Sequence, residues 1–518
     1  MAVARTRSVA LVGVTGRTVE VEADVGNGLA GIHLIGLPDT ALSEARDRVR
    51  SAMVNSHYPW PDARIIVSLF PASLPKRGSQ FDLAIAVAIL GAAGVVPAER
   101  IAEPFFLGEL GLDGRIRGVR GVLPSVLGAA GHGDVTVVVP AANAAEAVLV
   151  RDVKVVPVSD LRQLVEWLRK GGDAPSPVAQ EHEEPGTEDV APLQTTAALD
   201  VDLADVVGQP VARRALEVCA AGGHNLWMLG PPGTGKTMLA ERLPTLLPDL
   251  ELDHALEVTA IHSVAGTLPS NSPMMSRPPF VGPHHTATAA AIIGGGSTTV
   301  RPGAVSLAHR GVLFLDEAPE FQRSVLDALR QPLESGQVTV SRSVGSVTFP
   351  ARFMLVLAAN PCPCAQADDQ KDACRCTPTV KRRYLGRLSG PLLDRIDMKV
   401  MVTRSSRREL LADRQFVESS KVVAERVLAA RERAAARLAG TPWRSNAEIP
   451  SSVLHAEFRP SAGAMRPMTA CLDAGTLTAR GLDRVVRVAW TLADLAGKDA
   501  PGQDETNAAL GFWLGTHS

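Results

Sequence analysis

The chain has 518 residues, and 46% of them are hydrophobic, so it can form about three domains with sizeable cores. Lysine and arginine number 53 against 55 acidic residues, and the net charge of −2 excludes a global basic field, so any contact with DNA needs a local patch. Aromatic residues make up 4%, which argues against base stacking as the main binding device.

Three features predict a soluble cytoplasmic protein without membrane contact. The basic start, 1–7, is followed by an apolar run that reaches Arg17 too soon to be a signal peptide. The most apolar window, Phe81–Pro97, has 17 residues and contains Asp82, so it fits a core helix better than a membrane span. Six cysteines, four of them clustered, do not resemble a disulfide framework.

Residues 1–170 mix β-like alternation with apolar helical stretches. They resemble the proteolytic domain of the Lon family in three stretches, Pro71–Leu90, Leu107–Leu110 and Gly114–Leu127. The resemblance implies a ribosomal-protein-like α/β fold and, in an active enzyme, a catalytic pair made of a serine and a lysine.

That catalytic pair is missing from the matching positions. A gapless alignment places Gln80 where the serine should stand, with Ser79 one position early, and it places Leu123 where the lysine should stand. Lys76 is the only nearby amine, and a serine hydroxyl without a nearby base is a weak nucleophile. We therefore interpret 1–170 as an inactive protease fold that serves as a docking or DNA-handling collar; active proteolysis is the alternative.

Residues 171–199 form a segment of different composition. It contains six acidic residues and four prolines, and it has no lysine or arginine. This composition predicts an exposed acidic linker, and an ordered acidic loop is the alternative.

Residues 200–403 alternate strand-like and helix-like segments, which predicts a parallel sheet with helices on both faces. An early segment fits the phosphate loop G-x-x-x-x-G-K-[ST] and consists of Gly230, Pro231, Pro232, Gly233, Thr234, Gly235, Lys236 and Thr237. In such a loop the backbone N–H groups close around phosphates, the lysine reaches the β- and γ-phosphates, and the threonine holds Mg²⁺. Upstream, Asp205–Gln209 precedes a helix and is a candidate for lining the adenine pocket.

The apolar run Val312–Leu315 predicts a buried strand that delivers two carboxylates at its end, Asp316 and Glu317. Asp316 can hold the metal, and Glu317 can orient or deprotonate the attacking water. Because the phosphate loop and the carboxylate strand occur together in this order, we predict an ATP-hydrolysing machine that uses ATP and Mg²⁺.

The next apolar run, Phe353–Ala359, ends in Asn360 and is followed by Pro361. A polar amide at the end of a buried strand beside the carboxylate strand can hold the attacking water near the γ-phosphate. The alternative is an ordinary turn residue at the strand end. We expect Asn360 to act in catalysis.

Two arginines are candidates for stabilising charge on the transferred phosphoryl group. Arg395 lies on a short apolar turn and is a candidate arginine finger that acts on the neighbouring subunit, which implies an oligomer; a salt bridge with Asp394 or Asp397 is the alternative. Arg480 opens the last predicted helix and could reach the γ-phosphate from a lid, with Arg484 as its competitor. Two solvated arginines at a helix start are the alternative there.

Four cysteines cluster between Asn360 and Arg395, namely Cys362, Cys364, Cys374 and Cys376. Four thiolates can close a tetrahedral Zn²⁺ site, which leaves no open position for catalysis. The C-x-C spacing is tighter than the common spacing, and four reduced surface cysteines are the alternative. We expect a structural zinc.

Residues 404–518 have a helical pattern and are expected to form a lid. With the core, they resemble the AAA+ superfamily. Four stretches resemble its magnesium-chelatase-related branch, namely Pro283–Thr286, Ile292–Gly296, Arg301–Gly303 and Ser306–His309. This resemblance implies an insertion in the second core helix, at about Leu268–Arg301. It also implies a β-hairpin at Gln337–Phe349, before the strand that ends in Asn360. In a ring of subunits, both would face the central channel.

The domain order resembles the ComM/YifB family over nearly the full length. The resemblance implies an α/β protein with a Lon-like N-terminal domain, a three-layer P-loop core and a helical lid. It also implies an ATP-driven hexameric motor that promotes branch migration on single-stranded or branched DNA during recombination and natural transformation. A magnesium-chelatase-like metal-insertion motor and an ATP-dependent protease or unfoldase are the alternatives.

Overall fold

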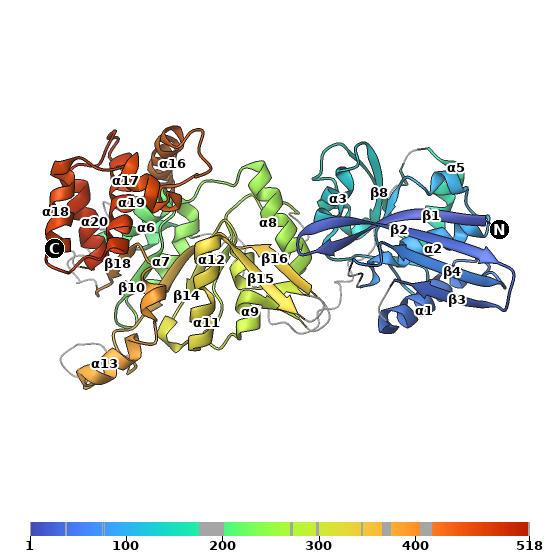
Figure 1. The fold of residues 1–518 in the computed structure, drawn as a ribbon, viewed down its shortest axis with the longest axis horizontal. Coiled ribbons are helices and arrows are strands. Elements are labelled where there is room, and N and C mark those ends of the chain that lie inside the picture. The colour runs from blue at the N-terminus through green and yellow to red at the C-terminus, as the bar shows by residue number, and fades with distance from the viewer. Residues whose placement is uncertain are drawn as a thin grey trace.

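The computed structural model describes residues 2–36, 39–74, 76, 78–172, 174–175, 201–269, 273–296, 300–342, 345–364, 374–404 and 417–515. The chain builds an N-terminal α/β domain, a central parallel sheet with helices, and a C-terminal group of helices, arranged along one axis (Figure 1). The predicted acidic linker, 171–199, lies almost wholly outside the described residues. Among the helices of the described ranges, none combines the length and the apolar character needed to span a bilayer.

The N-terminal domain contains a mixed seven-stranded sheet with the order β3-β4-β2-β1-β5-β8-β9. Its strands are β1 (Ala2–Val12), β2 (Thr15–Gly26), β3 (Gly31–Ile35), β4 (Arg64–Phe70), β5 (Phe105–Phe106), β8 (Val135–Pro140) and β9 (Val153–Val158), beside the short pair β6 (Glu109–Leu110) and β7 (Ile116–Arg117). Its helices are α1 (Asp39–Asn55), α2 (Asp82–Ala92), α3 (Val122–Ala130), α4 (Ala144–Ala147) and α5 (Leu161–Lys170).

Helix α2 is the central core helix of this domain. Every one of its residues is buried, because its sequence is apolar on all sides. The one charge in it, Asp82, accepts a 2.6 Å hydrogen bond from Nε of Arg48. Burial nevertheless raises the pKa of Asp82 to about 6, against the opposing effect of Arg48. The most apolar window of the sequence is therefore a core helix, as predicted.

The central sheet has five parallel strands in the order β11-β14-β17-β10-β18. They are β10 (Leu226–Leu229), β11 (Phe280–Val281), β14 (Val312–Leu315), β17 (Met354–Ala359) and β18 (Met398–Met401). The helices around them are α6 (Pro210–Gly222), α7 (Lys236–Arg242), α8 (Leu252–Ala265), α9 (Ala289–Ile293), α10 (Ala304–Leu307), α11 (Arg323–Ala328), α12 (Arg330–Ser335), α13 (Pro378–Leu385) and α14 (Gly390–Leu393). Strands β14 and β17 are buried throughout, which is why each reads as an uninterrupted apolar run.

The segment inserted between β11 and β14 is shorter than the insertion predicted at Leu268–Arg301. Part of that range, Phe280–Val281, is strand β11, which pairs in parallel with β14 at the edge of the sheet. The inserted segment runs from α9 to α10 and contains the antiparallel pair β12 (Gly294–Gly295) and β13 (Arg301–Pro302). The expected hairpin is present as β15 (Gln337–Arg342) and β16 (Gly345–Pro350).

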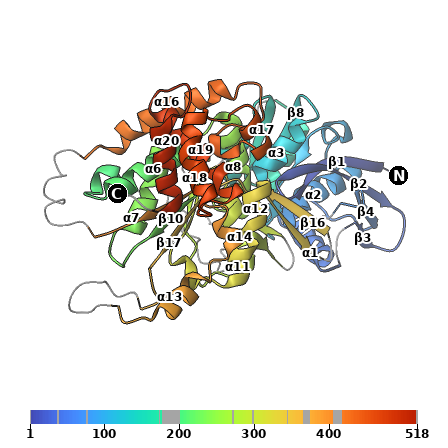
Figure 2. The same cartoon turned by 60° about the vertical axis from the view of Figure 1, so that its left-hand side comes forward.

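The C-terminal region is helical, as predicted, and comes forward in Figure 2. It consists of α16 (Ser420–Arg437), α17 (Ser451–Ala456), α18 (Ala462–Asp473), α19 (Ala479–Leu495) and α20 (Gln503–Leu514). Its apolar residues share one hydrophobic cluster with α6 and the central sheet. Arg484 of α19 pairs with the buried Asp397 at 2.9 Å, which ties these helices to the end of the core.

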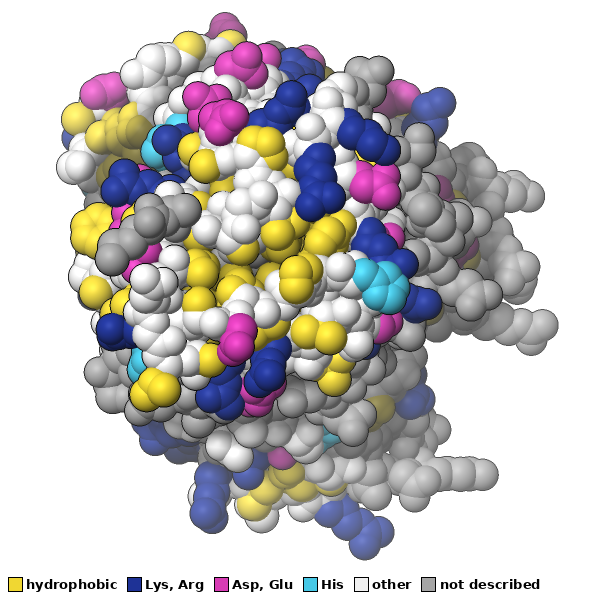
Figure 3. All heavy atoms as spheres, turned by 90° about the vertical axis from the view of Figure 1, so that its right-hand side faces the viewer, with side chains coloured by type: hydrophobic (Ala, Val, Ile, Leu, Met, Phe, Trp, Pro, Cys, Tyr) yellow, Lys and Arg dark blue, Asp and Glu magenta, His cyan; other side chains and the backbone are white. Residues whose placement is uncertain are grey.

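The N-terminal domain packs directly on the core, at α8 and β16 (Figure 1). Ser263 of α8 donates a 2.7 Å hydrogen bond to the buried Glu146, and its carbonyl accepts from the backbone of Gly121. At the β1–β2 turn, a Cβ on Gly13 would lie 2.8 Å from the carbonyl oxygen of Thr348, so a larger residue does not fit. The opposite end of this domain presents a face with hydrophobic side chains gathered in its middle (Figure 3).

Candidate nucleotide site

The five parallel strands of the central sheet end at one edge, and the chain places polar residues directly after three of them, β10, β14 and β17. The phosphate loop follows β10, Asp316 and Glu317 follow β14, and Asn360 follows β17. Parallel strands bring their carboxyl ends to the same edge, so these residues meet although they are far apart in the sequence.

The phosphate loop has the backbone that the motif requires. Gly233 and Gly235 have φ of 73° and 85°, in the left-handed region that favours glycine. A Cβ on Gly230 would lie 2.2 Å from the carbonyl oxygen of Val402, so only glycine fits there as well. The loop therefore keeps the close backbone approach that phosphate binding needs.

Lys236 lies inside this loop and is only 8% exposed. Its Nζ donates to the carbonyl oxygens of Gly230 at 2.8 Å and Pro231 at 2.9 Å, and to Oδ1 of Asn360 at 3.1 Å. Burial lowers the pKa of Lys236, while Asp316 and Glu317 act in the opposite direction. The structure thus brings the predicted lysine and the predicted strand-end amide into direct contact.

Thr237 and Asp316 provide a pair of oxygen ligands. The Thr237 hydroxyl donates a 2.7 Å hydrogen bond to Oδ2 of Asp316, and Oδ1 of Asp316 accepts from the backbone N–H of Glu317 at 2.8 Å. A hydroxyl beside a carboxylate is a suitable ligand set for Mg²⁺, which prefers oxygen. Glu317 has a φ of 49°, and its side chain is half exposed. The donor set fits ATP with Mg²⁺.

The two predicted arginines form ion pairs with acidic residues and have no described contact with the phosphate loop. Arg395 pairs with Glu334 of α12, so its ion pair is with neither acid considered from the sequence. Arg480 is 74% exposed and pairs with Asp394 at 3.3 Å, next to Arg395. Its competitor Arg484 is held by a buried aspartate, so Arg480 is the more accessible of the two.

The segment Asp205–Gln209 lies at the start of the core and contacts two later parts of it. Asp205 accepts a 2.9 Å hydrogen bond from Arg242, which lowers the pKa of this carboxyl. Gln209 donates to the carbonyl oxygen of Thr403. These contacts position the segment between α7 and the end of β18.

The residues aligned with the protease pair are not arranged as a catalytic pair. Ser79 donates to Glu109, and the side chain of Gln80 donates to the carbonyl of Val9 at 3.0 Å. Lys76 is 2% exposed and donates to the carbonyl oxygens of Pro71 and Leu74. Leu123 is fully buried.

The four clustered cysteines come together around one point. Their Sγ atoms all lie within 4.8 Å of one another. The Sγ of Cys362 lies 3.0 Å from that of Cys364 and 3.3 Å from that of Cys374. The cluster joins the segment after Asn360 to α13, which extends away from the sheet in both views (Figures 1 and 2).

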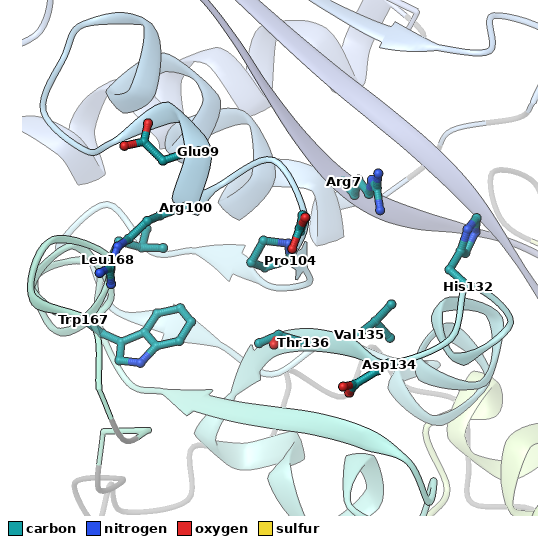
Figure 4. A pocket seen from close by; sticks show the side chains of 11 residues that line it. Arg7, Glu99, Arg100, Pro104, His132, Asp134, Val135, Thr136, Trp167 and Leu168 are labelled. Atoms are coloured by element: carbon teal, nitrogen blue, oxygen red, sulfur yellow. The ribbon is translucent and has the colours of Figure 1, made fainter.

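A separate cavity of about 490 Å³ lies in the N-terminal domain (Figure 4). Its lining includes two arginines, Arg7 and Arg100, the histidine His132, and three acidic residues, Glu99, Glu103 and Asp134. None of the predicted site residues lines it. Since its lining carries charges of both signs, it favours no class of ligand.

One site residue escaped the sequence analysis as a functional candidate. Nδ1 of His285 lies 3.4 Å from Oε2 of Glu317, and the His284 ring packs 4.1 Å from the His285 ring. Both histidines follow β11, which ends at the same edge of the sheet. The available signal was a polar pair placed shortly after a short apolar run, as at Asp316 and Asn360.

The fold and site define a nucleotide-binding ATPase of the AAA+ type. Three family models match, described as magnesium chelatase, subunit ChlI (202–410), subunit ChlI of Mg-chelatase (21–143), and the ChlI C-terminal region (417–513).

Relatives match over the whole length. An uncharacterized protein of Mycobacterium tuberculosis is 53% identical over 99% of both chains. The competence protein ComM of Haemophilus influenzae is 40% identical over 99% of this chain and 97% of its own. YifB of Escherichia coli, an uncharacterized protein, is 40% identical over 97% of this chain and 95% of its own. The chain belongs to the ComM/YifB family of magnesium-chelatase-related AAA+ proteins.

Proposed function

We propose that the chain is an ATP-driven motor that acts on DNA as a ring of identical subunits, most simply a hexamer, and drives branch migration in recombination. The observation that carries the proposal is the division of the nucleotide site. Lys236, Asn360 and the two carboxylates lie together, whereas Arg395 is paired with Glu334 elsewhere in the chain. An arginine that stabilises the phosphoryl group must reach it, so we infer that a neighbouring subunit supplies Arg395.

In this proposal each residue has one task. Lys236 holds the phosphates, Thr237 and Asp316 hold the metal, and Glu317 activates a water positioned by Asn360. When bound, Mg²⁺ neutralises charge on the phosphates. Arg395 from the neighbour stabilises the transferred group, and Arg480 acts with it from the lid. The resulting movement of the lid and hairpin pulls the strand.

DNA is the proposed polymer for two reasons. The H. influenzae relative is named a competence protein. The hairpin β15–β16 also exposes hydroxyl side chains near its tip, where Ser341 and Ser346 are 2.9 Å apart and exposed. Hydroxyl groups are suitable donors to phosphate oxygens and carry no sequence preference.

ATPase and unwinding assays on single-stranded, forked and four-way DNA test the proposal. We expect DNA to stimulate ATP hydrolysis, four-way DNA to be resolved into duplexes, and mass photometry to find a ring. Glu317→Gln is the inactive control. A chain that stays monomeric and hydrolyses ATP equally with and without DNA would contradict the proposal.

The two other functions receive less support. A metal-insertion motor rests on the descriptions of the family models, and it predicts an ATPase indifferent to DNA. A Lon-like protease needs a lysine amine as base beside its serine, but Ser79 donates a hydrogen bond to the Glu109 carboxylate, and Lys76 donates to carbonyl oxygens. A protease would also degrade casein in an ATP-dependent way that Ser79→Ala abolishes.

We also propose that the four cysteines hold a structural Zn²⁺. Sulfur ligands about 2.3 Å from zinc lie close together, and a set of four within 4.8 Å needs little adjustment to reach that geometry. The ion would fasten α13 to the segment that follows Asn360. Metal analysis of the full chain purified without chelators should find about one zinc per chain. The double variant Cys374→Ser/Cys376→Ser should lose it, and absence of metal from the unmodified chain would refute the site.

A further inference from the structure

The segment that carries α13 is strongly basic, although the whole chain has a net charge of −2. From Cys374 to Leu388 it has four arginines, one lysine and no acidic residue. We propose that this segment, called the α13 arm below, binds the phosphate backbone of DNA as a second contact besides the hairpin β15–β16. The inference rests on the proposed DNA motor and supplies the local basic patch that a chain without a global basic field needs.

Three cations of the α13 arm are available to a ligand. The side chains of Arg375, Arg382 and Arg383 are exposed, and none of them has an ion pair or a hydrogen bond with a residue in the described ranges. By contrast, Arg426 of α16 pairs with Glu217 at 2.7 Å. Adjacent arginines without acidic partners repel one another, and a bound anion relieves that repulsion.

The acidic residues nearest in the sequence do not cancel this charge. Residues 365–373, which lie outside the described ranges, contain three aspartates and one lysine. The whole stretch 361–388 therefore has six basic residues against three acidic ones. The stretch keeps a net positive charge even with these aspartates included.

The α13 arm is fastened to the core at both ends. At its start, Sγ of Cys374 lies 3.3 Å from Sγ of Cys362, in the segment after β17. At its end, Arg387 donates a 2.9 Å hydrogen bond to Oε2 of Glu320, and Leu388 is buried in the cluster that includes β14 and β17. Between these points α13 extends away from the sheet in both views (Figures 1 and 2). The arginines are thus presented by a helix with a fixed base.

The exposed side chains of the α13 arm favour a polyanion over a protein surface. A stable protein interface has an apolar centre, but Val380 is the one large hydrophobic residue exposed on the arm, all of which the structure describes. Arginine donates two parallel hydrogen bonds to a phosphate. Tyr384, the aromatic residue of the arm, is buried, so its ring is not free to stack on bases. The contact should therefore be independent of DNA sequence.

DNA binding by the full-length double variant Arg382→Gln/Arg383→Gln tests the inference. The variant removes two positive charges and adds no acid, so its affinity for single-stranded DNA should fall by about ten-fold, equally for different sequences. Each phosphate contact on a single strand adds about 0.7 to the slope of log affinity against log salt concentration, so that slope should decrease by about 1.4. Fluorescence anisotropy over a salt series measures both quantities.

Two further variants serve as controls. Arg382→Lys/Arg383→Lys keeps both charges and should retain most of the salt dependence. Arg459→Gln/Arg466→Gln is the matched control in the C-terminal helical region, where both arginines are exposed and have no ion pair within the described ranges. This control should leave the affinity for DNA unchanged.

The outcomes separate the α13 arm from the motor. If Arg382→Gln/Arg383→Gln binds DNA with wild-type affinity and salt dependence, the inference is wrong even where DNA stimulates ATP hydrolysis. If the variant no longer assembles without DNA, the inference is also wrong, because the arginines then contact a neighbouring subunit. If the wild type binds DNA but its ATP hydrolysis is not stimulated, the proposed motor fails, and weaker binding by the variant still supports the arm. A wild type that binds no DNA contradicts both proposals.

Discussion

Lys236 and Lys76 are both buried lysines whose Nζ atoms donate to backbone carbonyl oxygens, one in the core and one in the N-terminal domain. Their exposed fractions are 8% and 2%, and burial lowers the pKa of both. The difference lies in what surrounds them. Lys236 has Asn360 at 3.1 Å and two nearby carboxylates, and it belongs to a loop whose glycines leave room for phosphate.

The contrast shows that a buried lysine does not by itself define a catalytic site. The N-terminal domain also contains a lysine, a serine and an acid, but Ser79 donates to Glu109, and Lys76 donates to carbonyl oxygens of its own loop. The charges of the N-terminal domain pair within the fold, whereas those of the core gather at the carboxyl ends of the parallel strands. Substitutions in the two regions should therefore affect different measurements.

The largest effect is expected from Lys236→Met. The substitution keeps much of the apolar stem but removes the charge that holds the phosphates, so ATPase activity should fall by about 100-fold or more. The steady-state rate of ATP hydrolysis measures this loss of activity.

Lys76→Met is the matched variant in the other region. It should leave ATP hydrolysis unchanged and alter only the thermal unfolding of the protein. A comparable loss of hydrolysis in both variants would break the contrast between the two lysines.

A smaller effect is expected from Asp82→Asn, near Ser79. Because burial raises the pKa of Asp82 to about 6, the folded protein binds a proton that the unfolded chain has lost. The stability contributed by the protonated carboxyl is fully present below the unfolded pKa and is lost as the pH rises through about 6. Unfolding by denaturant between pH 4 and 7 should show a decrease of about 1–3 kcal/mol that flattens in Asp82→Asn. An unaltered pH dependence in the variant would exclude this assignment.

The smallest effect is expected from Ser79→Ala. Its hydroxyl donates to a carboxylate, which is a much weaker base than the lysine amine of the protease pair, so its removal should change neither ATP hydrolysis nor the expected lack of casein degradation. Casein cleavage that disappears in Ser79→Ala would reverse our interpretation of the N-terminal domain.

Sequence reasoning predicted those site residues that directly follow a buried strand. Lys236, Asp316 and Asn360 each follow a buried apolar run, and parallel pairing brings such ends together, so their contacts could be anticipated. Strand β11 was missed because two residues, Phe280–Val281, are too short for a pattern, and the partner of Glu317 was missed with it.

The ion pair between Arg395 and Glu334 could not be predicted from the sequence either. It depends on how α12 lies against α14, which no local pattern encodes. The same holds for the N-terminal domain, where the resemblance located Ser79 and Lys76 but the path of the loop decides their partners.

Mixing two inactive variants tests the central claim that neighbouring subunits complete the nucleotide site. Lys236→Ala removes the phosphate contact within a subunit, and Arg395→Ala removes the group supplied to the neighbour. Each alone should be inactive, but in mixed rings roughly a quarter of the interfaces combine an intact Lys236 with an intact Arg395 from the next subunit. We predict that the equimolar mixture recovers ATP hydrolysis; a mixture that stays inactive, or a fully active monomer of Arg395→Ala, would contradict it.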